Sequence, residues 1–346
     1  MSVFKNRRKK LIESSGGKEI VVATPPNLFY VTDFFGSGYG IVKEDKTILI
    51  TNTLEGFRAE SFAQETEILT IEKWKDSWKY LRKMLEGDAI VDSTKSLERI
   101  RGLKENSKIF LNVRRIKDRV EVERIKKASD VIDRVFKRLE TEIKPGRSEF
   151  EISSYAMEEA LKAGCTTNGF DSAFSPIIIA TGANSAYPHA ELSERKVSKR
   201  DVVLCDISLR YRGYNSDATR TFAVGSVDDE FRSNYNVVKE SEKRGEELCY
   251  EEESCARVSL ESRKVLKRNG LEKFLLHGIG HGVGIEIHEL PSISNSSKEL
   301  LQNNDVVTVE PGVYFKGEYG IRIEDTILVG HKPEPLHRYT KELVTL

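Results

Sequence analysis

The chain has 346 residues, enough for about two domains of average size. Its 55 lysine and arginine residues balance 55 aspartate and glutamate residues, so the formal net charge is zero and nothing in it favours a nucleic acid or an anionic membrane as a partner. Hydrophobic residues make up 38% of the chain and charged residues 32%, which is typical of a soluble globular protein. No apolar run approaches the about 18 residues of a membrane span, and residues 1–15 lack the apolar stretch of a secretory signal.

The cysteine pattern predicts a reduced, cytoplasmic protein. The four cysteines contain no Cys-x-x-Cys pair, and they are too few to form a disulfide framework in a chain of this length. We therefore expect four free thiols, as is usual in the cytoplasm.

The first part of the chain alternates short apolar runs with helical patterns. Strands are predicted at residues 19–24, 40–43, 47–51 and 89–91, and helices at residues 4–14 and 77–86. This alternation predicts a smaller α/β domain over residues 1–115. A charged stretch leads from it into a helical pattern over residues 121–143, and we place the second domain at residues 116–346.

The second part begins with helices and continues with strands. Ser148 and Glu151 have the spacing of a capping box, which predicts a helix that ends at Gly164. Further strands are predicted at 175–181, 202–211, 214–224, 306–315 and 319–330, with helices at about 229–248 and 254–268. The pattern mixes helices and strands in an α+β arrangement.

Two of the predicted hairpins carry paired carboxylates. Asp206 and Asp217 lie about symmetrically around a turn expected at 211–213, and Glu310 and Glu324 lie symmetrically around Lys316-Gly317. Opposed carboxylates repel one another across a sheet, so two such pairs within apolar strands require a compensating cation. Four carboxylates balance two divalent ions, and the pattern therefore predicts a two-metal site.

Three of the six histidines fall within a short glycine-rich segment. His277 and His281 have the spacing of a zinc-binding helix, but alternating glycines from Gly278 to Gly284 oppose a helix. The segment is better interpreted as extended backbone that passes close to a site, with His288 at its end.

Taken in chain order, these motifs resemble the pita-bread metallopeptidases, the family of prolidase, aminopeptidase P, methionine aminopeptidase and the metal-free creatinase. The resemblance rests on Asp206, SDATRTF (216–222), HGIGHGVGIEIHE (277–289), VEPGVY (309–314) and GIRIEDT (320–326), and also on ANSAYPH (183–189). NLFYVTDFFGSGYG (27–40) resembles the start of the prolidase-type N-terminal domain. The resemblance implies a creatinase/prolidase-like N-terminal α/β domain before a pita-bread catalytic domain, and it favours the prolidase and aminopeptidase P branch.

The resemblance also implies roles for individual residues. The implied ligands of two divalent ions, Mn or Co before Zn or Fe, are Asp206, Asp217, His281, Glu310 and Glu324. Glu310 is also the implied catalytic base, and the other implied catalytic residues are His189, His277, His288 and Arg322, supported by Thr219 and Arg220.

The implied activity is hydrolysis of Xaa-Pro bonds by a homodimeric exopeptidase, with small proline-containing peptides as substrates and Xaa-Pro dipeptides favoured. An Xaa-Pro aminopeptidase acting on longer peptides is the alternative, and a metal-free hydrolase or a non-catalytic binding protein on the same fold are remote ones. Two departures from the family pattern stand out. Ser208 replaces the usual glycine two residues after Asp206, and Lys298 is the only cation between Glu289 and Glu310, where prolidases often carry an arginine.

Overall fold

The computed structural model describes residues 2–94, 103–167 and 175–346. The chain folds into two compact units, Met1–Arg114 and Arg115–Leu346. Within the described ranges, none of the helices combines the length and the apolar character that crossing a membrane requires.

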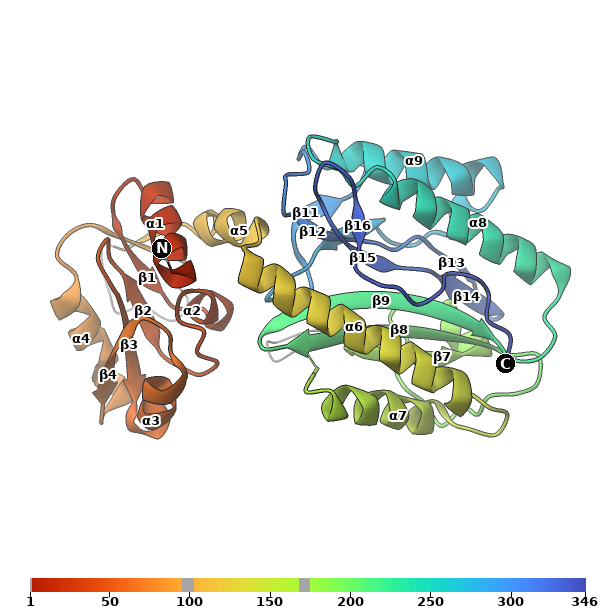
Figure 1. Ribbon diagram of the computed structural model, residues 1–346, viewed down its shortest axis with the longest axis horizontal. Coiled ribbons are helices and arrows are strands. Elements are labelled where there is room, and N and C mark those ends of the chain that lie inside the picture. The colour runs from red at the N-terminus through yellow and green to blue at the C-terminus, as the bar shows by residue number, and fades with distance from the viewer. Residues whose placement is uncertain (1, 95–102, 168–174) are drawn as a thin grey trace. The chain divides into compact units, whose positions relative to one another are not determined.

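The N-terminal unit is built on a six-stranded mixed sheet with the order β4-β3-β2-β1-β5-β6 (Figure 1). Strands β1 to β3 form an antiparallel meander, whereas β4 pairs parallel with β3 and β5 parallel with β1. The strands predicted in this part of the chain are confirmed, and their inward side chains form a buried core with Leu81. The elements are α1 (Val3–Ser14), β1 (Glu19–Val22), α2 (Pro25–Thr32), β2 (Tyr39–Val42), β3 (Thr47–Asn52), α3 (Thr53–Phe62), β4 (Thr66–Ile71), α4 (Ser77–Met84), β5 (Ala89–Val91) and β6 (Lys104–Glu105). Helix α5 (Lys108–Arg115) follows.

The C-terminal unit contains a three-stranded sheet, β7-β8-β9, a five-stranded sheet, β11-β10-β12-β15-β16, and the pair β13-β14. Its helices are α6 (Arg119–Glu142), α7 (Glu149–Lys162), α8 (Asp229–Glu246) and α9 (Cys255–Arg268). Its strands are β7 (Ile177–Thr181), β8 (Val202–Tyr211), β9 (Tyr214–Ala223), β10 (Gly280–Gly282), β11 (Glu289–Ile293), β12 (Val306–Val309), β13 (Gly312–Phe315), β14 (Tyr319–Arg322), β15 (Asp325–Leu328) and β16 (Glu334–Pro335).

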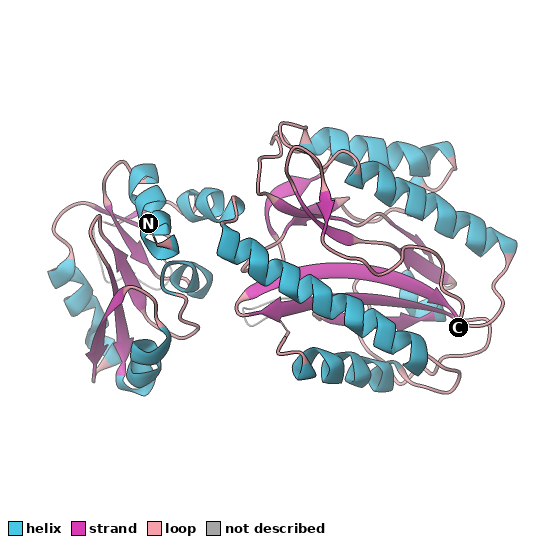
Figure 2. Ribbon diagram, in the orientation of Figure 1, coloured by secondary structure: helices cyan, strands magenta, loops and turns pink. Residues whose placement is uncertain are grey.

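The two helix pairs of this unit cover the strands from outside. Helices α6 and α7 pack on β7 to β9 through a buried cluster that includes Phe136, Ile152 and Phe222. Helices α8 and α9 pack on the larger sheet through a second cluster, which includes Val258 and Ile327. Figure 2 shows the strands lying between these helices. Both helix pairs bury apolar faces, so the strands are left to carry the polar site between them.

The expected capping box of α7 is confirmed. The Ser148 hydroxyl accepts a hydrogen bond from the Glu151 backbone, and the Glu151 carboxylate accepts one from the Ser148 backbone. The helix ends before Gly164, whose φ of +78° is the left-handed conformation that favours glycine after a helix.

The β8–β9 hairpin differs from the expected register by two residues. Its turn consists of Arg212 and Gly213 alone, both with positive φ, so that Tyr211 pairs with Tyr214. Asp206 therefore pairs with Thr219, and Asp217 with Ser208. The two aspartates still share one face of the ladder, but they are diagonal neighbours and not direct partners.

The predicted hairpin with Glu310 and Glu324 is divided into two ladders. Its turn at 316–318 is confirmed, and one register runs through both ladders, with Gly312 opposite Arg322 and Val309 opposite Asp325. Between them the strands separate at the two glutamates. Pro311 has no N–H to donate there, the Glu310 N–H donates to Ile279 O at 2.7 Å, and the Glu324 N–H donates to Thr219 O at 3.1 Å. This opening joins the hairpin to β9 on one side and to the segment that precedes β10 on the other.

Candidate metal centre

A cavity of about 260 Å³ opens in the C-terminal unit at this junction. All of the site residues expected from the sequence line it: His189, Asp206, Asp217, His277, His281, His288, Glu310, Arg322 and Glu324. They come from β8, β9, β10, β14 and the connections around them, so the two hairpins and the glycine-rich segment meet at one place.

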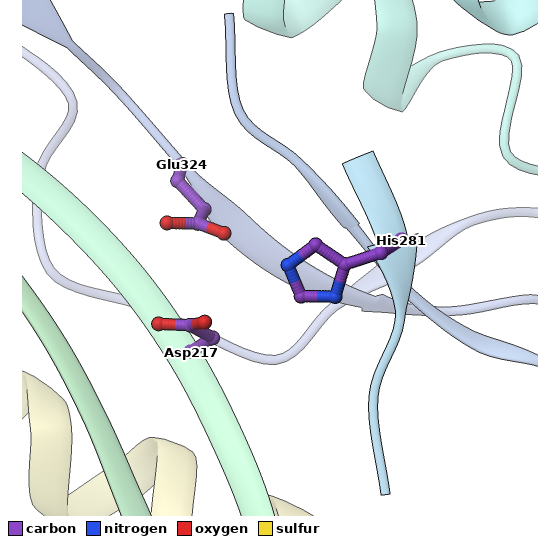
Figure 3. Close-up of side chains that lie close together, drawn as sticks. All are labelled: Asp217, His281 and Glu324. Atoms are coloured by element: carbon purple, nitrogen blue, oxygen red, sulfur yellow. The ribbon is translucent and has the colours of Figure 1, made fainter. Parts of the chain in front are cut away.

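Three of these side chains form the tightest group. One potential ligand atom each of Asp217, His281 and Glu324 lies within 4.8 Å of the other two, and Figure 3 shows the two carboxylates and the imidazole facing a common space. Glu310 adjoins them, with its Oε1 atom 3.6 Å from His281 Nε2. Asp206 lies on the Asp217 face of the β8–β9 ladder and lines the same cavity.

Glycine allows the backbone of β10 to bring His281 into this group. A Cβ atom at Gly280 would lie 2.0 Å from Thr308 O, and one at Gly282 would lie 2.1 Å from Leu290 O. Both positions therefore exclude any side chain, because the neighbouring strands approach too closely. The interpretation of this segment as extended backbone close to a site is confirmed.

The buried carboxylates of the cavity have raised pKa values because they are shielded from water and repel one another. Burial, together with the charges of Asp206 and Glu310, raises the pKa of Asp217 to about 7. Burial likewise raises the pKa of Glu310 to about 8, with a contribution from Asp206. The pKa of Glu324 is raised well above its ordinary value by burial and by Asp217 and Glu310. A divalent cation relieves this repulsion, and carboxylates with one imidazole are suitable ligands for it.

Two hydroxyl groups hold the carboxylates in place. Thr219 Oγ1 donates to Glu324 Oε2 at 2.7 Å, and Ser208 Oγ donates to Asp217 Oδ1 at 2.8 Å. The serine at the unusual position is therefore accommodated, and it contributes a bond of its own.

Arg322 is buried beside the cavity and binds several groups at once. Its guanidinium forms an ion pair with Asp206, donates from Nε to Thr219 Oγ1 at 3.2 Å and donates from Nη1 to Tyr314 Oη at 2.6 Å. The ion pair with Asp206 and three further hydrogen bonds, one of them to Pro188 O, fix its position.

A directed chain of hydrogen bonds runs from Arg322 to His277. Because Arg322 is only a donor, Tyr314 donates its own hydrogen to His277 Nε2 at 2.7 Å, and His277 Nδ1 donates to Gly278 O at 2.7 Å. These partners define the neutral tautomer of His277. Burial, followed by the charge of Arg322, lowers the pKa of His277 to about 3, in agreement with a neutral ring.

Tyr314 is a site residue that the sequence analysis missed. It lies diagonally from Arg322 on one face of the β13–β14 ladder, opposite Gly320, while Arg322 lies opposite Gly312. The signal was present in the sequence, since a tyrosine and an arginine that each face a glycine across a short hairpin have room to meet.

The other outer histidines are also held neutral by burial. Burial lowers the pKa of His288 to about 4, assisted by the nearby His281 ring. It also lowers the pKa of His189, assisted by the charge of Arg322. Neutral imidazoles can each donate one hydrogen bond to a substrate at neutral pH.

Arg220 supports the site from behind, whereas Lys298 lies apart from it. The Arg220 side chain is 2% exposed, and it donates to Glu324 O at 2.6 Å and to Asp325 Oδ1 at 2.7 Å. It therefore fixes the backbone next to Glu324. Lys298 is exposed and is not among the residues that line the cavity.

A cavity lined by four carboxylates, four histidines and a buried arginine is typical of a metal-dependent hydrolase. Residues 123–331 match metallopeptidase family M24, and residues 6–135 match the creatinase/prolidase N-terminal domain. The chain therefore belongs to metallopeptidase family M24 and is a metal-dependent peptidase with an N-terminal domain of the creatinase/prolidase type.

Three similar proteins align with this chain over nearly their whole length. The chain is 31% identical to an Xaa-Pro dipeptidase of Pyrococcus furiosus over 94% of this chain and 95% of that protein. The crystal structure of the prolidase from Pyrococcus horikoshii superposes with a TM-score of 0.89 at 26% identity, covering 99% of this chain and 100% of that chain. The crystal structure of an X-Pro aminopeptidase from Thermotoga maritima also gives a TM-score of 0.89 at 26% identity, covering 99% of both chains.

Proposed function

We propose that this chain is a dinuclear-metal exopeptidase that hydrolyses Xaa-Pro peptide bonds, with Xaa-Pro dipeptides as its favoured substrates. One observation carries the proposal: four carboxylates and an imidazole, from β8, β9, β10 and the opening of the hairpin at Glu310 and Glu324, line one cavity together with three further histidines. The relative of Pyrococcus furiosus that is named Xaa-Pro dipeptidase supports the substrate class, because it aligns with 94% of this chain.

We propose that two divalent ions bind at this site, Mn or Co in preference to Zn or Fe. The residues that would hold them are Asp206, Asp217, His281, Glu310 and Glu324. Four carboxylates balance the charge of two divalent ions, and oxygen donors with one imidazole favour this group of metals. When bound, paired ions supply a water molecule activated at neutral pH and polarise the scissile carbonyl.

Glu310 is the proposed proton carrier. It is one of the two cavity carboxylates at the opening of the hairpin. In this proposal it accepts the proton of the attacking water and returns it to the leaving nitrogen, which in an Xaa-Pro bond is the proline nitrogen. His189 and His288 line the same cavity as neutral rings, and each can donate a hydrogen bond to the substrate carbonyl as negative charge develops on it.

His277 and Arg322 act together in this proposal. Both ring nitrogens of His277 have protein partners, Tyr314 and Gly278, so the ring holds Tyr314 in place. Tyr314 in turn holds Arg322, which pairs with Asp206. This series of hydrogen bonds keeps one face of the metal centre rigid, while substrate binds on the other face. A preorganised site requires such rigidity.

One observation favours the alternative, an Xaa-Pro aminopeptidase. A dipeptidase must bind the carboxylate at the end of its substrate, and such a group prefers a bidentate arginine. Arg322 is the single lysine or arginine among the described residues that line the cavity, and it is already engaged by Asp206. A peptide longer than two residues needs no cation at this point.

Substrate length therefore provides the test of the proposed function. We expect kcat/KM on an Xaa-Pro dipeptide to exceed that on its C-terminal amide by about thirtyfold, because a site that binds a carboxylate leaves its cation unpaired with the amide. The same comparison with an Xaa-Pro-Xaa tripeptide distinguishes the two activities. Equal or faster hydrolysis of the amide and the tripeptide would identify an Xaa-Pro aminopeptidase.

We also propose a cytoplasmic location and a domain boundary between residues 115 and 116. The four cysteines are buried and unpaired, as expected in a reducing compartment. The compact units Met1–Arg114 and Arg115–Leu346 support the division into a creatinase/prolidase-like domain, 1–115, and a catalytic domain, 116–346.

The proposed oligomer is a homodimer. Helix α3 exposes large apolar side chains, with Leu54 84% exposed, Phe57 82% and Phe62 62%, and such a surface is costly to leave in water. We expect light scattering at micromolar concentration to give about twice the chain mass of 39.3 kDa. Replacing Leu54 and Phe57 by serine should yield the monomer if α3 forms the contact, and a wild-type mass of 39.3 kDa would refute the dimer.

A further inference from the structure

Ser208 places a hydroxyl group directly across the ladder from Asp217. The two residues are paired between β8 and β9, and Ser208 Oγ donates to Asp217 Oδ1 at 2.8 Å. Both side chains are nearly inaccessible to water, and both residues line the cavity. The bond is therefore shielded from competing water molecules, and a shielded hydrogen bond to a carboxylate is among the stronger ones.

The position of this bond matters because Asp217 belongs to the tightest group in the cavity. To share an ion with His281 and Glu324, an Asp217 oxygen has to lie near both side chains. One potential ligand atom of each of the three residues lies within 4.8 Å of the other two. A carboxylate without a partner rotates about its terminal torsion, which is broad and shallow. A donor on Oδ1 fixes the plane of the group, so the carboxylate does not have to be ordered when an ion arrives.

The next pair on the same face of the ladder has the same composition. Asp206 lies opposite Thr219, as Asp217 lies opposite Ser208, so that each pair joins a carboxylate on one strand to a hydroxyl on the other. The hydroxyl of Thr219 donates to Glu324, at 2.7 Å. Two of the three carboxylates around His281 are thus each held by a separate hydroxyl group, and the strand pairing supplies both donors.

We propose that Ser208 is a positioning residue of the metal centre, whose hydroxyl holds the Asp217 carboxylate in its metal-binding orientation and thereby sets the affinity for divalent ions. The inference rests on the proposed function, since it requires that Asp217 bind a metal. Partners of metal ligands typically contribute about 10-fold to 100-fold to metal affinity.

The test is the affinity of the full-length chain for Mn²⁺, measured by competition with a chelating indicator. Ser208→Ala removes the hydroxyl and keeps the Cβ atom, and we expect it to weaken Mn²⁺ binding by about 10-fold to 100-fold. Ser208→Thr retains a hydroxyl on a residue that suits a strand, and we expect it to recover at least part of the affinity.

The matched control is Ser241→Ala. Ser241 is buried between α8 and α9, where its hydroxyl donates to Ser262 O at 2.8 Å, so the same atoms are removed away from the cavity. We expect wild-type Mn²⁺ affinity in this variant. Melting curves without metal separate a loss of folding from a loss of affinity, and Ser208→Gly replaces Ser208→Ala if the alanine variant does not fold.

The outcomes distinguish the inference from the proposed function. Mn²⁺ binding by the wild type with unchanged affinity in Ser208→Ala, or an equal loss in Ser208→Ala and Ser208→Thr, would overturn the role of Ser208 alone. A lowered melting temperature with unchanged affinity would do the same, because it indicates a purely structural bond. A wild-type chain that binds no divalent ion would instead overturn the metal centre.

Discussion

Glu310→Gln is expected to lower kcat on an Xaa-Pro substrate by about 10³-fold, which is within the usual range for loss of a proton-transfer group. The amide has nearly the same shape, and its oxygen can still serve as a ligand, but it cannot accept a proton from water. Folding should be unaffected, because the carboxylate lies in the cavity, where its oxygens are 3.6 Å from His281 Nε2 and 3.7 Å from His277 Nδ1, too far for hydrogen bonds. Metal content measured on the same sample shows whether the lower kcat comes from the missing proton carrier or from a loss of metal.

Two further variants make the result specific. Glu242→Gln removes another buried carboxylate, whose pKa burial also raises to about 8, but it is bonded to Lys341 away from the cavity. This control should keep kcat within a few-fold of wild type. Asp217→Asn should instead lower metal occupancy, because a proposed metal ligand loses its charge. Near-normal turnover of Glu310→Gln at full metal occupancy would remove Glu310 from the role of base.

Much of the site could be predicted because the pairing of residues in a hairpin follows from the position of its turn. Residues equidistant from a hairpin turn lie side by side, so Glu310 and Glu324 were expected to be neighbours from the position of Lys316-Gly317 alone. The structure keeps this register from Val309 to Gly312 even though the ladder opens between them. Alternating glycines similarly indicated close backbone contact, which the approach of Gly280 and Gly282 to neighbouring strands confirms.

Two features could not be predicted: the exact backbone conformation of a turn, and hydrogen bonds to segments distant in the sequence. The turn expected around 211–213 is found there, but it is a two-residue turn of Arg212 and Gly213, which forms because Arg212 adopts a positive φ, an uncommon conformation for a residue other than glycine. The resulting shift of two residues decides that Ser208, and not Asp206, faces Asp217. The break at the two glutamates depends on partners outside the hairpin, Thr219 and Ile279, which no local pattern reveals.

Removal of the metal ions should abolish activity, and Mn or Co should restore it. The expectation follows from the carboxylates around His281, whose charges repel one another when no cation lies between them. Activity is measured after exhaustive dialysis against a chelator, with metal content determined by elemental analysis, and again after each metal is added back. Full activity with a metal content near zero would contradict the proposal and favour a metal-free hydrolase that uses histidines alone.

Metal removal should also change how stability depends on pH. In the metal-free protein the pKa of Asp217 is raised to about 7 and that of Glu310 to about 8, above their ordinary values of 3.8 and 4.5. Between about pH 6.5 and pH 8 the folded state therefore binds more protons than the unfolded state at these groups, so stability falls as the pH rises. His277 and His288, whose folded pKa values are lowered to about 3 and about 4, are neutral in the folded state, whereas in the unfolded state they are about half protonated at pH 6.5. They therefore offset this fall only near the lower end of the range and not toward pH 8.

The metal-loaded protein should lose less stability over the same range, because the bound cations keep the carboxylates ionised and remove the difference in proton binding. The melting temperatures of the loaded and metal-free proteins should thus diverge from pH 6.5 to pH 8. Glu242, whose raised pKa lies in the same range, is present in both forms, so its contribution cancels in the difference. Parallel melting curves across this range would show that the cavity carboxylates do not form the cation site, whatever the activity measurements give.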